Sequence, residues 1–297
     1  MADLLPADAS GAPSFDPDRY KSTTVEQWQA AAAAWYAWGP VIDAWLADST
    51  ERMFDLAGIG SGSRVLDVAA GAGGQSVSAA RRVGPGGHVL ATDISPRLLD
   101  YAAHAARMAG VADVLRTQVA DGEHLPVPDG SFDAVISRVG LIYFPDRVAA
   151  LRGMRRALRA GGRIGSVTYS TPEANGFFSV PIAVVRSEAR LPPPSPHQPG
   201  PFSLGTDDVL HETLTAAGFV DVVVDHVPSP LRLPTVDDMV LFARESFGAL
   251  HTMMAGLDEE GRERTWRRMA DELARFQGPD GFVGPCEMLV VGATNPG

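Results

Sequence analysis

The sequence predicts an α/β fold with a mostly parallel, seven-stranded sheet and helices on both faces. Two observations carry this prediction. From Ser63 onward, short runs rich in β-branched residues alternate with amphipathic helical runs, which is the pattern of a parallel sheet covered on both sides. The first of these strands also leads directly into a stretch of small residues, Ala69 to Gly74, at the end of the sheet where such folds bind their ligands.

The predicted organisation of the chain has four parts. An N-terminal tail and helical lid occupy residues 1–62, the core of the fold residues 63–235, a helical cap insertion residues 236–280, and the last core strand with its tail residues 281–297. The core strands are expected at Arg64–Val68, His88–Asp93, Val114–Val119, Phe132–Ser137, Gly162–Tyr169, Val220–His226 and Glu287–Gly292.

The segment before the first strand is expected to be helical. Residues up to about Ser14 are rich in Ala, Pro, Asp and Ser and predict a loose tail. The run Thr24–Ala57 then has a helical pattern, which Gly39-Pro40 should interrupt. Four tryptophans among its alanines suit helices that pack an aromatic face on a neighbouring body, and we expect them to form a lid: Trp28, Trp35, Trp38 and Trp45.

Two of the connecting helices have clear start and stop signals. One should begin after Ser95, with Pro96 at its first position, and end at Gly110. The other should run from about Asp146 to Ala160 and stop at Gly161-Gly162.

Two segments depart from the alternating pattern. Leu191–Pro201 contains six prolines and predicts an extended surface loop. Val236–Phe276 predicts two further helices between the last two strands, and its Met and Phe residues suit either plain core or the wall of a ligand pocket.

Composition excludes several classes of function. Lys and Arg total 25 against 36 Asp and Glu, for a formal net charge of −11, and such a surface repels phosphate backbones, so we expect no nucleic-acid partner. The single Cys excludes an intramolecular disulfide, and no apolar run is long enough to span a bilayer. The N-terminal residues lack the layout of a secretion signal. We expect a cytoplasmic protein without membrane insertion.

The small-residue loop after the first strand predicts close approach of a ligand to the backbone. Loops with Gly71 and Gly73 in this arrangement also serve NAD and FAD. Two details argue against a dinucleotide. Ser76 stands where the dinucleotide fingerprint has a third glycine, and Asp67 places a carboxylate where a pyrophosphate would lie. That carboxylate suits a ligand with an ammonium and a sulfonium group, such as S-adenosylmethionine, although it could instead brace the loop.

Acidic residues follow the next two strands as well. Asp93 ends the second strand, where a carboxylate can accept both hydroxyls of a ribose, and Ile94 can lie against an adenine ring. After the third strand, Asp121 can accept from the adenine amine while the backbone N–H groups of Gly122 or Glu123 donate to ring nitrogens. Three acidic strand ends together favour a ligand site over three separate helix caps.

At this point the chain resembles class I methyltransferases of the ubiquinone/menaquinone-biosynthesis C-methyltransferase type, a group that includes natural-product tailoring enzymes. The similarity runs from about Trp28 to Phe219. It is carried by Val65-Leu66-Asp67-Val68-Ala69-Ala70-Gly71-Ala72-Gly73, Ala91-Thr92-Asp93-Ile94-Ser95, Asp121-Gly122-Glu123, Ser131-Phe132-Asp133-Ala134-Val135-Ile136-Ser137-Arg138, Phe144-Pro145-Asp146 and Leu158-Arg159-Ala160-Gly161-Gly162-Arg163.

The resemblance implies a Rossmann-like sheet with an antiparallel last strand, and S-adenosylmethionine as the methyl donor. It places Asp67 and the backbone of Ala69–Gly73 near the methionine part of the donor. Asp93, Ile94, Asp121 and Gly122 would face its ribose and adenine, and Ser137 and Arg138 would lie between donor and acceptor. One departure is visible, because Ala69 replaces the first glycine of the usual loop.

Methyl transfer from a sulfonium is an in-line displacement that needs neither a metal nor a covalent intermediate. That chemistry suits a chain whose seven histidines are scattered and form no metal-ligand cluster. No residue stands out as a general base. Only His197, in the proline-rich loop, and Tyr143, after the fourth strand, are candidates.

Three functions remain open at this level. The first is a methyltransferase for a small-molecule acceptor, natural-product or quinone-like, which could act as a homodimer. The second keeps bound S-adenosylmethionine but catalyses a non-transfer reaction, such as a pericyclic one. The third is an NAD-type oxidoreductase, which Asp67 and Ser76 disfavour.

Overall fold

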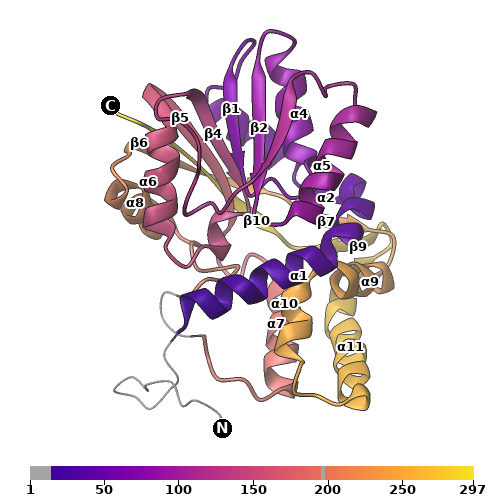
Figure 1. Cartoon of the computed structure of the whole chain (residues 1–297). Helices are drawn as coiled ribbons and strands as arrows, with labels where there is room; N and C mark the ends of the chain where they lie inside the picture. Colours follow the sequence, from indigo (N-terminus) through magenta and orange to yellow (C-terminus); the bar gives the residue numbers. More distant parts are fainter. Residues whose placement is uncertain (1–14, 195–197) are drawn as a thin grey trace.

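The computed structural model describes residues 15–194 and 198–297, and its centre is a seven-stranded sheet with helices on both faces (Figure 1). The strand order is β3-β2-β1-β4-β5-β10-β6. All pairs are parallel except those of β10, which runs antiparallel to both β5 and β6. This confirms the predicted Rossmann-like α/β fold. The strands are β1 (Arg64–Val68), β2 (His88–Asp93), β3 (Leu115–Val119), β4 (Phe132–Arg138), β5 (Leu158–Tyr169), β6 (Val220–Pro228) and β10 (Glu287–Thr294).

Central strands of this sheet read as nearly continuous apolar runs because both of their faces are covered. Val65, Leu66 and Val68 of β1 are all buried, as are Ala134, Val135 and Ile136 of β4. The covering helices are α4 (Gly74–Val83), α5 (Pro96–Met108), α6 (Arg147–Ala157) and α8 (Asp207–Ala216). The predicted start of α5 is confirmed, since the Ser95 side chain accepts from the backbone N–H of Leu98 at 3.3 Å.

The predicted end of α6 is wrong by three residues. The helix stops at Ala157, and Leu158 already has the extended backbone of β5. The cause lies far along the chain. The Asn295 side-chain amide donates to the carbonyl of Arg155, in the last turn of α6, and to those of Leu158 and Arg159, at the start of β5.

Three helices precede the sheet: α1 (Pro17–Ala37), α2 (Gly39–Trp45) and α3 (Ala47–Leu56). The break at Gly39-Pro40 is confirmed, but α1 begins earlier than Thr24. Asp16 caps it by accepting from the backbone N–H of Arg19 at 3.0 Å, and Pro17 occupies its first position. The tail predicted before Ser14 lies outside the described residues.

A helical layer adjoins the sheet body at one end, and α1 lies between the two (Figure 1). The predicted pair of cap helices is in fact three, because Phe247 leaves helical geometry and separates α9 (Val236–Ser246) from α10 (Gly248–Met253), with α11 (Glu259–Leu273) following. Helix α7 (Gly176–Glu188), which follows β5, packs against α11 and α10 and so belongs to the same layer.

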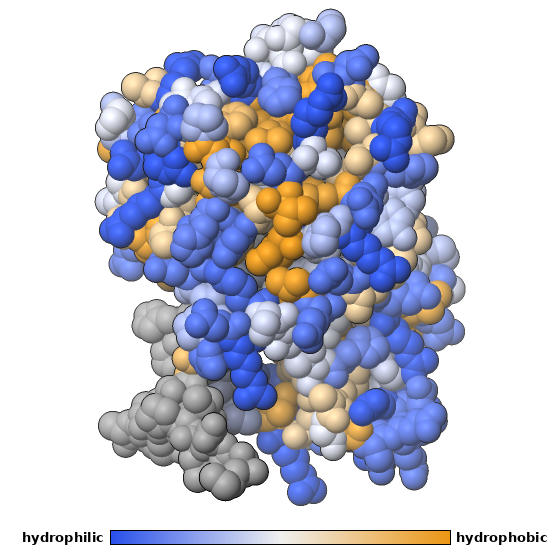
Figure 2. Space-filling model, in the orientation of Figure 1, coloured by the Kyte–Doolittle hydropathy of each residue, from blue (hydrophilic) through white to orange (hydrophobic). Residues whose placement is uncertain are grey.

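A small antiparallel sheet of β7 (Leu231–Leu233), β9 (Gly281–Gly284) and β8 (Gln277–Gly278) completes the layer, and the sequence patterns did not predict it. The described parts of the proline-rich loop contain no helix or strand, as expected. None of the helices in the described ranges is both long and apolar enough to cross a membrane. The face seen in Figure 2 is largely hydrophilic, with apolar residues gathered toward its middle.

Candidate functional site: a cavity at the carboxyl end of the sheet

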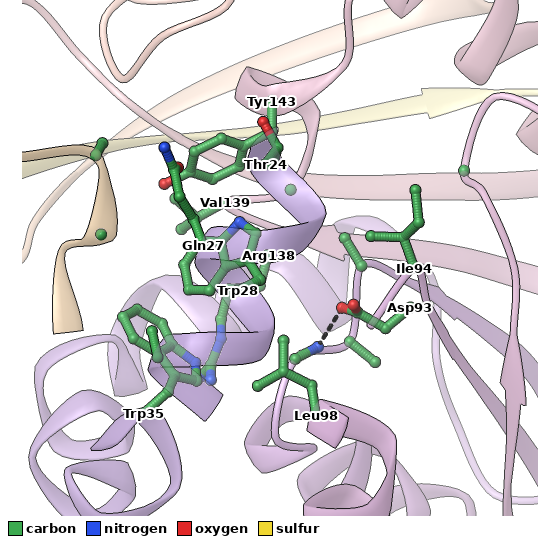
Figure 3. Close-up of a pocket in the computed structure, with 18 of the residues that line it drawn as sticks. Thr24, Gln27, Trp28, Trp35, Asp93, Ile94, Leu98, Arg138, Val139 and Tyr143 are labelled. Carbon is green, nitrogen blue, oxygen red and sulfur yellow. Dashed lines mark hydrogen bonds between the residues drawn. The ribbon is translucent and has the colours of Figure 1, made fainter. Parts of the chain in front are cut away.

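A cavity opens where β1, β2, β3 and β4 end, and α1 forms its opposite wall (Figure 3). Its sheet side is made by the residues that directly follow the strands, which is the place where parallel sheets present backbone and side chains to a ligand. Among the predicted residues, those that line it are Ala69, Gly71, Asp93, Ile94, Asp121, Gly122, Arg138 and Tyr143. Asp67, Gly73, Glu123 and Ser137 do not line it. His197 lies outside the described residues.

Asp93 is the best-fixed acid of the site. One of its oxygens accepts from the backbone N–H of Gly71 and the other from that of Ser95, each at 2.9 Å (Figure 3). A carboxylate oxygen can accept two hydrogen bonds, so each keeps capacity for one hydroxyl of a ligand. Burial raises the pKa of Asp93 although these backbone donors oppose the shift. The strand end therefore holds the carboxylate in one orientation.

Asp67 does not reach the cavity, which corrects its predicted contact with the donor. It is 0% exposed, and its carboxylate accepts from the Ser76 hydroxyl and, at 3.4 Å, from the Gln75 amide. Both donors lie in the first turn of α4. Burial raises the pKa of Asp67 to about 6, against those hydrogen bonds and the nearby charge of Arg138. Asp67 thus braces the loop, whereas Gln75 does line the cavity.

Gly73 and Ser137 also lie behind the cavity wall. Gly73 caps α4 with a φ of 89°, and a Cβ there would lie 2.8 Å from the Cα of Ala102, so glycine is needed for α4 and α5 to approach each other. Ser137 is buried, and in the described part of the chain its hydroxyl has no hydrogen-bond partner. A Cβ on Gly140 would lie 2.6 Å from both that hydroxyl and the methyl of Ala69.

Two non-glycine residues beside the cavity adopt a left-handed backbone conformation. Ala69 has a φ of 60° and Val139 a φ of 61°, and they follow the adjacent strands β1 and β4. Such conformations cost L-residues roughly 1–2 kcal/mol. Both line the cavity, so the strain is concentrated at the ligand side of the sheet.

Lys21 of α1 is a site residue that the sequence patterns missed. Its ammonium donates to Asp121 at 2.7 Å and to Glu123, and the other oxygen of Glu123 accepts from the backbone N–H of Asp146 at 2.8 Å. Although burial opposes the shift, these hydrogen bonds raise the pKa of Lys21. A signal existed in the sequence, because Lys21 is the only lysine of the chain.

The ammonium of Lys21 pairs with both acids that follow β3, Asp121 and Glu123. Asp121 accepts from the backbone N–H of Glu123 through one oxygen at 3.0 Å and from Lys21 through the other. The burial of Asp121 would raise its pKa, but the contact with Lys21 lowers it overall. Asp121, Glu123 and His124 lie close enough to share a cation, and the ammonium of Lys21 already pairs with both carboxylates of this cluster.

Arg138 lines the cavity at the end of β4, and its charge is balanced by Asp43 of α2. Its guanidinium donates to Asp43 at 3.1 Å and to the Thr50 hydroxyl at 3.2 Å. These partners belong to α2 and α3, so Arg138 ties the N-terminal helices to the sheet.

Gly122 lines the cavity after β3 and packs closely on Phe144, which lines it too. A Cβ on Gly122 would lie 2.5 Å from the ring of Phe144, so glycine is needed for this ring to lie against the strand end.

The wall opposite the sheet is aromatic. Trp28 lies between Trp35 and Tyr143, at ring-centroid distances of 5.2 and 5.4 Å (Figure 3). Burial raises the pKa of the Tyr143 phenol, so the phenol is protonated at neutral pH, and its role as a general base stays a prediction. The four tryptophans have different roles, since Trp38 packs on Phe242 of α9 and Trp45 lies in the core.

The central part of the chain is similar to a known protein family. The family described as Methyltransferase domain matches residues 66–165. An uncharacterized protein of Mycobacterium tuberculosis is 40% identical over 142 residues, which cover 46% of this chain and 49% of that protein. The ubiquinone/menaquinone biosynthesis C-methyltransferase of Pseudomonas putida is 36% identical over 138 residues, covering 43% and 54%. The chain thus spans about half the length of the curated relatives it matches.

Solved structures share the fold over most of the chain. The YcgJ protein of Bacillus subtilis superposes with a TM-score of 0.56 at 20% identity, covering 84% of this chain and 100% of that one. A phosphoethanolamine N-methyltransferase of Haemonchus contortus in complex with S-adenosyl-L-methionine gives 0.52 at 19% identity, covering 84% and 53%. The cyclase SpnF gives 0.54 at 18%, covering 91% and 97%. Residues 66–165 of this chain are therefore similar to the Methyltransferase domain family, and the chain has the α/β fold of solved methyltransferases.

Proposed function

We propose that this protein is a class I methyltransferase that binds S-adenosylmethionine and methylates a small organic molecule. The acceptor would be a natural product or a quinone-like molecule, as the sequence analysis predicts. The observation that carries the proposal is the convergence of four strand ends on one cavity within the region that matches the Methyltransferase domain family. The acidic net charge and the single cysteine are consistent with a cytoplasmic place of action.

The residues at the strand ends fit this donor. Asp93 has one free acceptor position on each oxygen for the ribose hydroxyls, and Ile94 offers an apolar surface beside it. Gly122 lines the cavity where the adenine would lie, and Gln75 and Arg138 line it where the methionine part would lie. When bound, S-adenosylmethionine supplies an electrophilic methyl group. The chain would align the acceptor with it and exclude water, which α1 and its aromatic residues are placed to do.

Calorimetric titration tests the donor site. S-adenosylmethionine and S-adenosylhomocysteine should bind, whereas NAD should not. Asp93→Asn keeps the shape but loses the charge that strengthens two ligand hydrogen bonds, each worth about 1.5–3 kcal/mol, so donor affinity should fall at least tenfold. Asp100→Asn, on the exposed face of α5, is the matched control and should bind as the wild type does. Equal affinity of the folded Asp93 variant would refute the assignment of β2, and tighter binding of NAD would refute the donor.

A second function is a non-transfer reaction that uses the same bound donor as a structural element. One observation favours it: no histidine among the described residues lines the cavity, so no obvious base serves an oxygen acceptor. The fold shared with the cyclase SpnF is compatible with this function. Release of one S-adenosylhomocysteine per product molecule separates the two functions. A methyl transfer releases it, whereas a cyclisation would consume the substrate without releasing S-adenosylhomocysteine.

A further inference from the structure

Ser246 is an unused polar group in the wall of the cavity. It is the last residue of α9 and only 1% exposed, and it lines the cavity. Its hydroxyl has no hydrogen-bond partner in the part of the chain that the structure describes. Buried hydroxyls are nearly always paired, so an unpaired one in the wall of a ligand cavity is available to the ligand.

The surroundings of Ser246 are aromatic and uncharged. Phe247 follows it and packs on Phe178 of α7 at a centroid distance of 4.7 Å, and Phe178 packs on Tyr169 of β5 at 5.8 Å. All three rings line the cavity. Aromatic faces arranged in this way bind a flat apolar ring system by stacking or edge contacts.

Both cations that line the cavity are already paired with a carboxylate. Lys21 is paired with Asp121, and Arg138 with Asp43. Asp93 is held at the end of β2 by two backbone donors. Among the described residues that line the cavity, no unpaired cation is therefore left to compensate a phosphate or carboxylate of a second molecule beside the donor, and transferring such a group from water would be costly.

We propose that the wall formed by α9, α10, α7 and the end of β5 is the acceptor subsite, and that Ser246 determines its specificity. The subsite takes a neutral, flat and largely apolar molecule with one hydroxyl or carbonyl oxygen, which pairs with the Ser246 hydroxyl. Calling this molecule the methyl acceptor rests on the proposed function. The binding preference itself does not.

Three probes test the subsite by equilibrium dialysis against the full chain. They share one ring system: 1-naphthol is neutral with an oxygen, naphthalene lacks the oxygen, and 1-naphthyl phosphate is anionic. We expect 1-naphthol to bind at least tenfold more tightly than the phosphate. Ser246→Ala should weaken 1-naphthol about tenfold and leave naphthalene unweakened, because only the oxygen loses its partner.

Controls separate this role from a structural one. A hydroxyl without an internal partner contributes nothing to the fold, so Ser246→Ala should melt no lower than the wild type. Ser246→Cys keeps the size with a weak donor and should lose 1-naphthol affinity in the same way. Ser22→Ala, on the exposed side of α1, should change neither binding nor melting.

The outcomes distinguish the subsite from the proposed function. Unchanged 1-naphthol affinity in both Ser246 variants, equal binding of the phosphate, or no saturable binding of 1-naphthol would overturn the subsite. If S-adenosylmethionine fails to bind in calorimetry while the naphthol preference and its loss in Ser246→Ala persist, the methyltransferase function fails and the subsite stands.

Discussion

Ala69 occupies a position where the backbone calls for glycine. Its φ of 60° costs an alanine roughly 1–2 kcal/mol, whereas glycine adopts it freely but loses more entropy on folding, by about 0.5–1 kcal/mol. The strain term is the larger one. Ala69→Gly should therefore raise the free energy of unfolding by up to about 1 kcal/mol, measured by urea denaturation.

Ala72 provides the matched control for this substitution, because it lies in the same loop without a positive φ. Ala72→Gly should lower stability by about 0.5–1 kcal/mol. If both glycine variants lose stability equally, Ala69 is not strained.

Asp67 makes stability depend on pH in an unusual direction. Its pKa is about 6 in the folded protein against 3.8 for the free group, so the folded state holds the proton more tightly. Stability contributed by the protonated form is thus present at low pH and lost as pH rises from about 4 to 6, by at most about 3 kcal/mol. Asp67→Asn, which stays neutral, should not show that loss.

The measurement is urea denaturation of both proteins at pH 4.5 and pH 7. Relative to Asp67→Asn, the wild type should be less stable at pH 7 than at pH 4.5. Asp100→Asn controls for the change of one carboxylate at the surface. Parallel pH profiles of wild type and Asp67→Asn would show that the buried carboxyl titrates normally.

Helix α1 is held across the cavity by Lys21, and this contact can be probed chemically. Because Lys21 is the only lysine, acetylation at a lysine side chain reports on this contact alone. Glu123→Gln removes one of the two charges that keep the amine protonated and enclosed. Acetylation of Lys21, followed by mass spectrometry, should become several-fold faster.

Glu51→Gln is the control, since Glu51 pairs with Arg82 at an exposed site away from the cavity. It should leave the acetylation rate of Lys21 unchanged. An equal rate in Glu123→Gln and the wild type would mean that the two acids do not hold α1.

We propose that the predicted lid ends between α1 and α2, before Trp45. Trp45 is 6% exposed, its indole donates to the Ser229 carbonyl at 2.8 Å, and its ring meets Phe177 at 5.0 Å. Deleting residues 1–37 should leave the sheet folded while donor affinity falls, because Trp28 and Trp35 leave the cavity wall. Deletion of residues 1–45 also removes a core side chain, at a cost of about 3–5 kcal/mol, and should lower the melting temperature sharply.

Circular dichroism and calorimetry with S-adenosylmethionine check both truncations. A folded 38–297 protein with wild-type affinity would remove α1 from the donor site. A 38–297 protein that fails to fold would make α1 part of the core.

Across the whole molecule, the sequence patterns predicted the sheet better than the helical layer. Buried strands such as β1 and β4 are continuous apolar runs with β-branched residues, so their position follows from local chemistry. The small sheet of β7, β8 and β9 has strands of two to four residues, too short for a periodicity. The end of α6 depends on Asn295, a partner 137 residues beyond Leu158.

The candidate site was also predicted in part, because only some of its residues are placed by local sequence patterns. Residues that directly follow a strand, such as Asp93 and Gly122, are placed by the strand itself. Lys21 and Ser246 reach the cavity from helices whose docking depends on tertiary packing, which no local pattern encodes. Asp67 is the opposite case, since its position was predicted but the direction of its carboxylate was set by Ser76 and Gln75.

The break at Phe247 has a consequence for how such a protein can diversify. Ser246, Phe247, Gly248 and Ala249 line one wall of the cavity from a single four-residue stretch at the α9–α10 junction, apart in sequence from every strand end. Mutations confined to the twelve nucleotides that encode these four residues can therefore reshape that wall and leave the wall formed by the strand ends unchanged. For an engineer, a saturation library of those four codons is small enough to screen completely, and its members keep the same sheet to fold on.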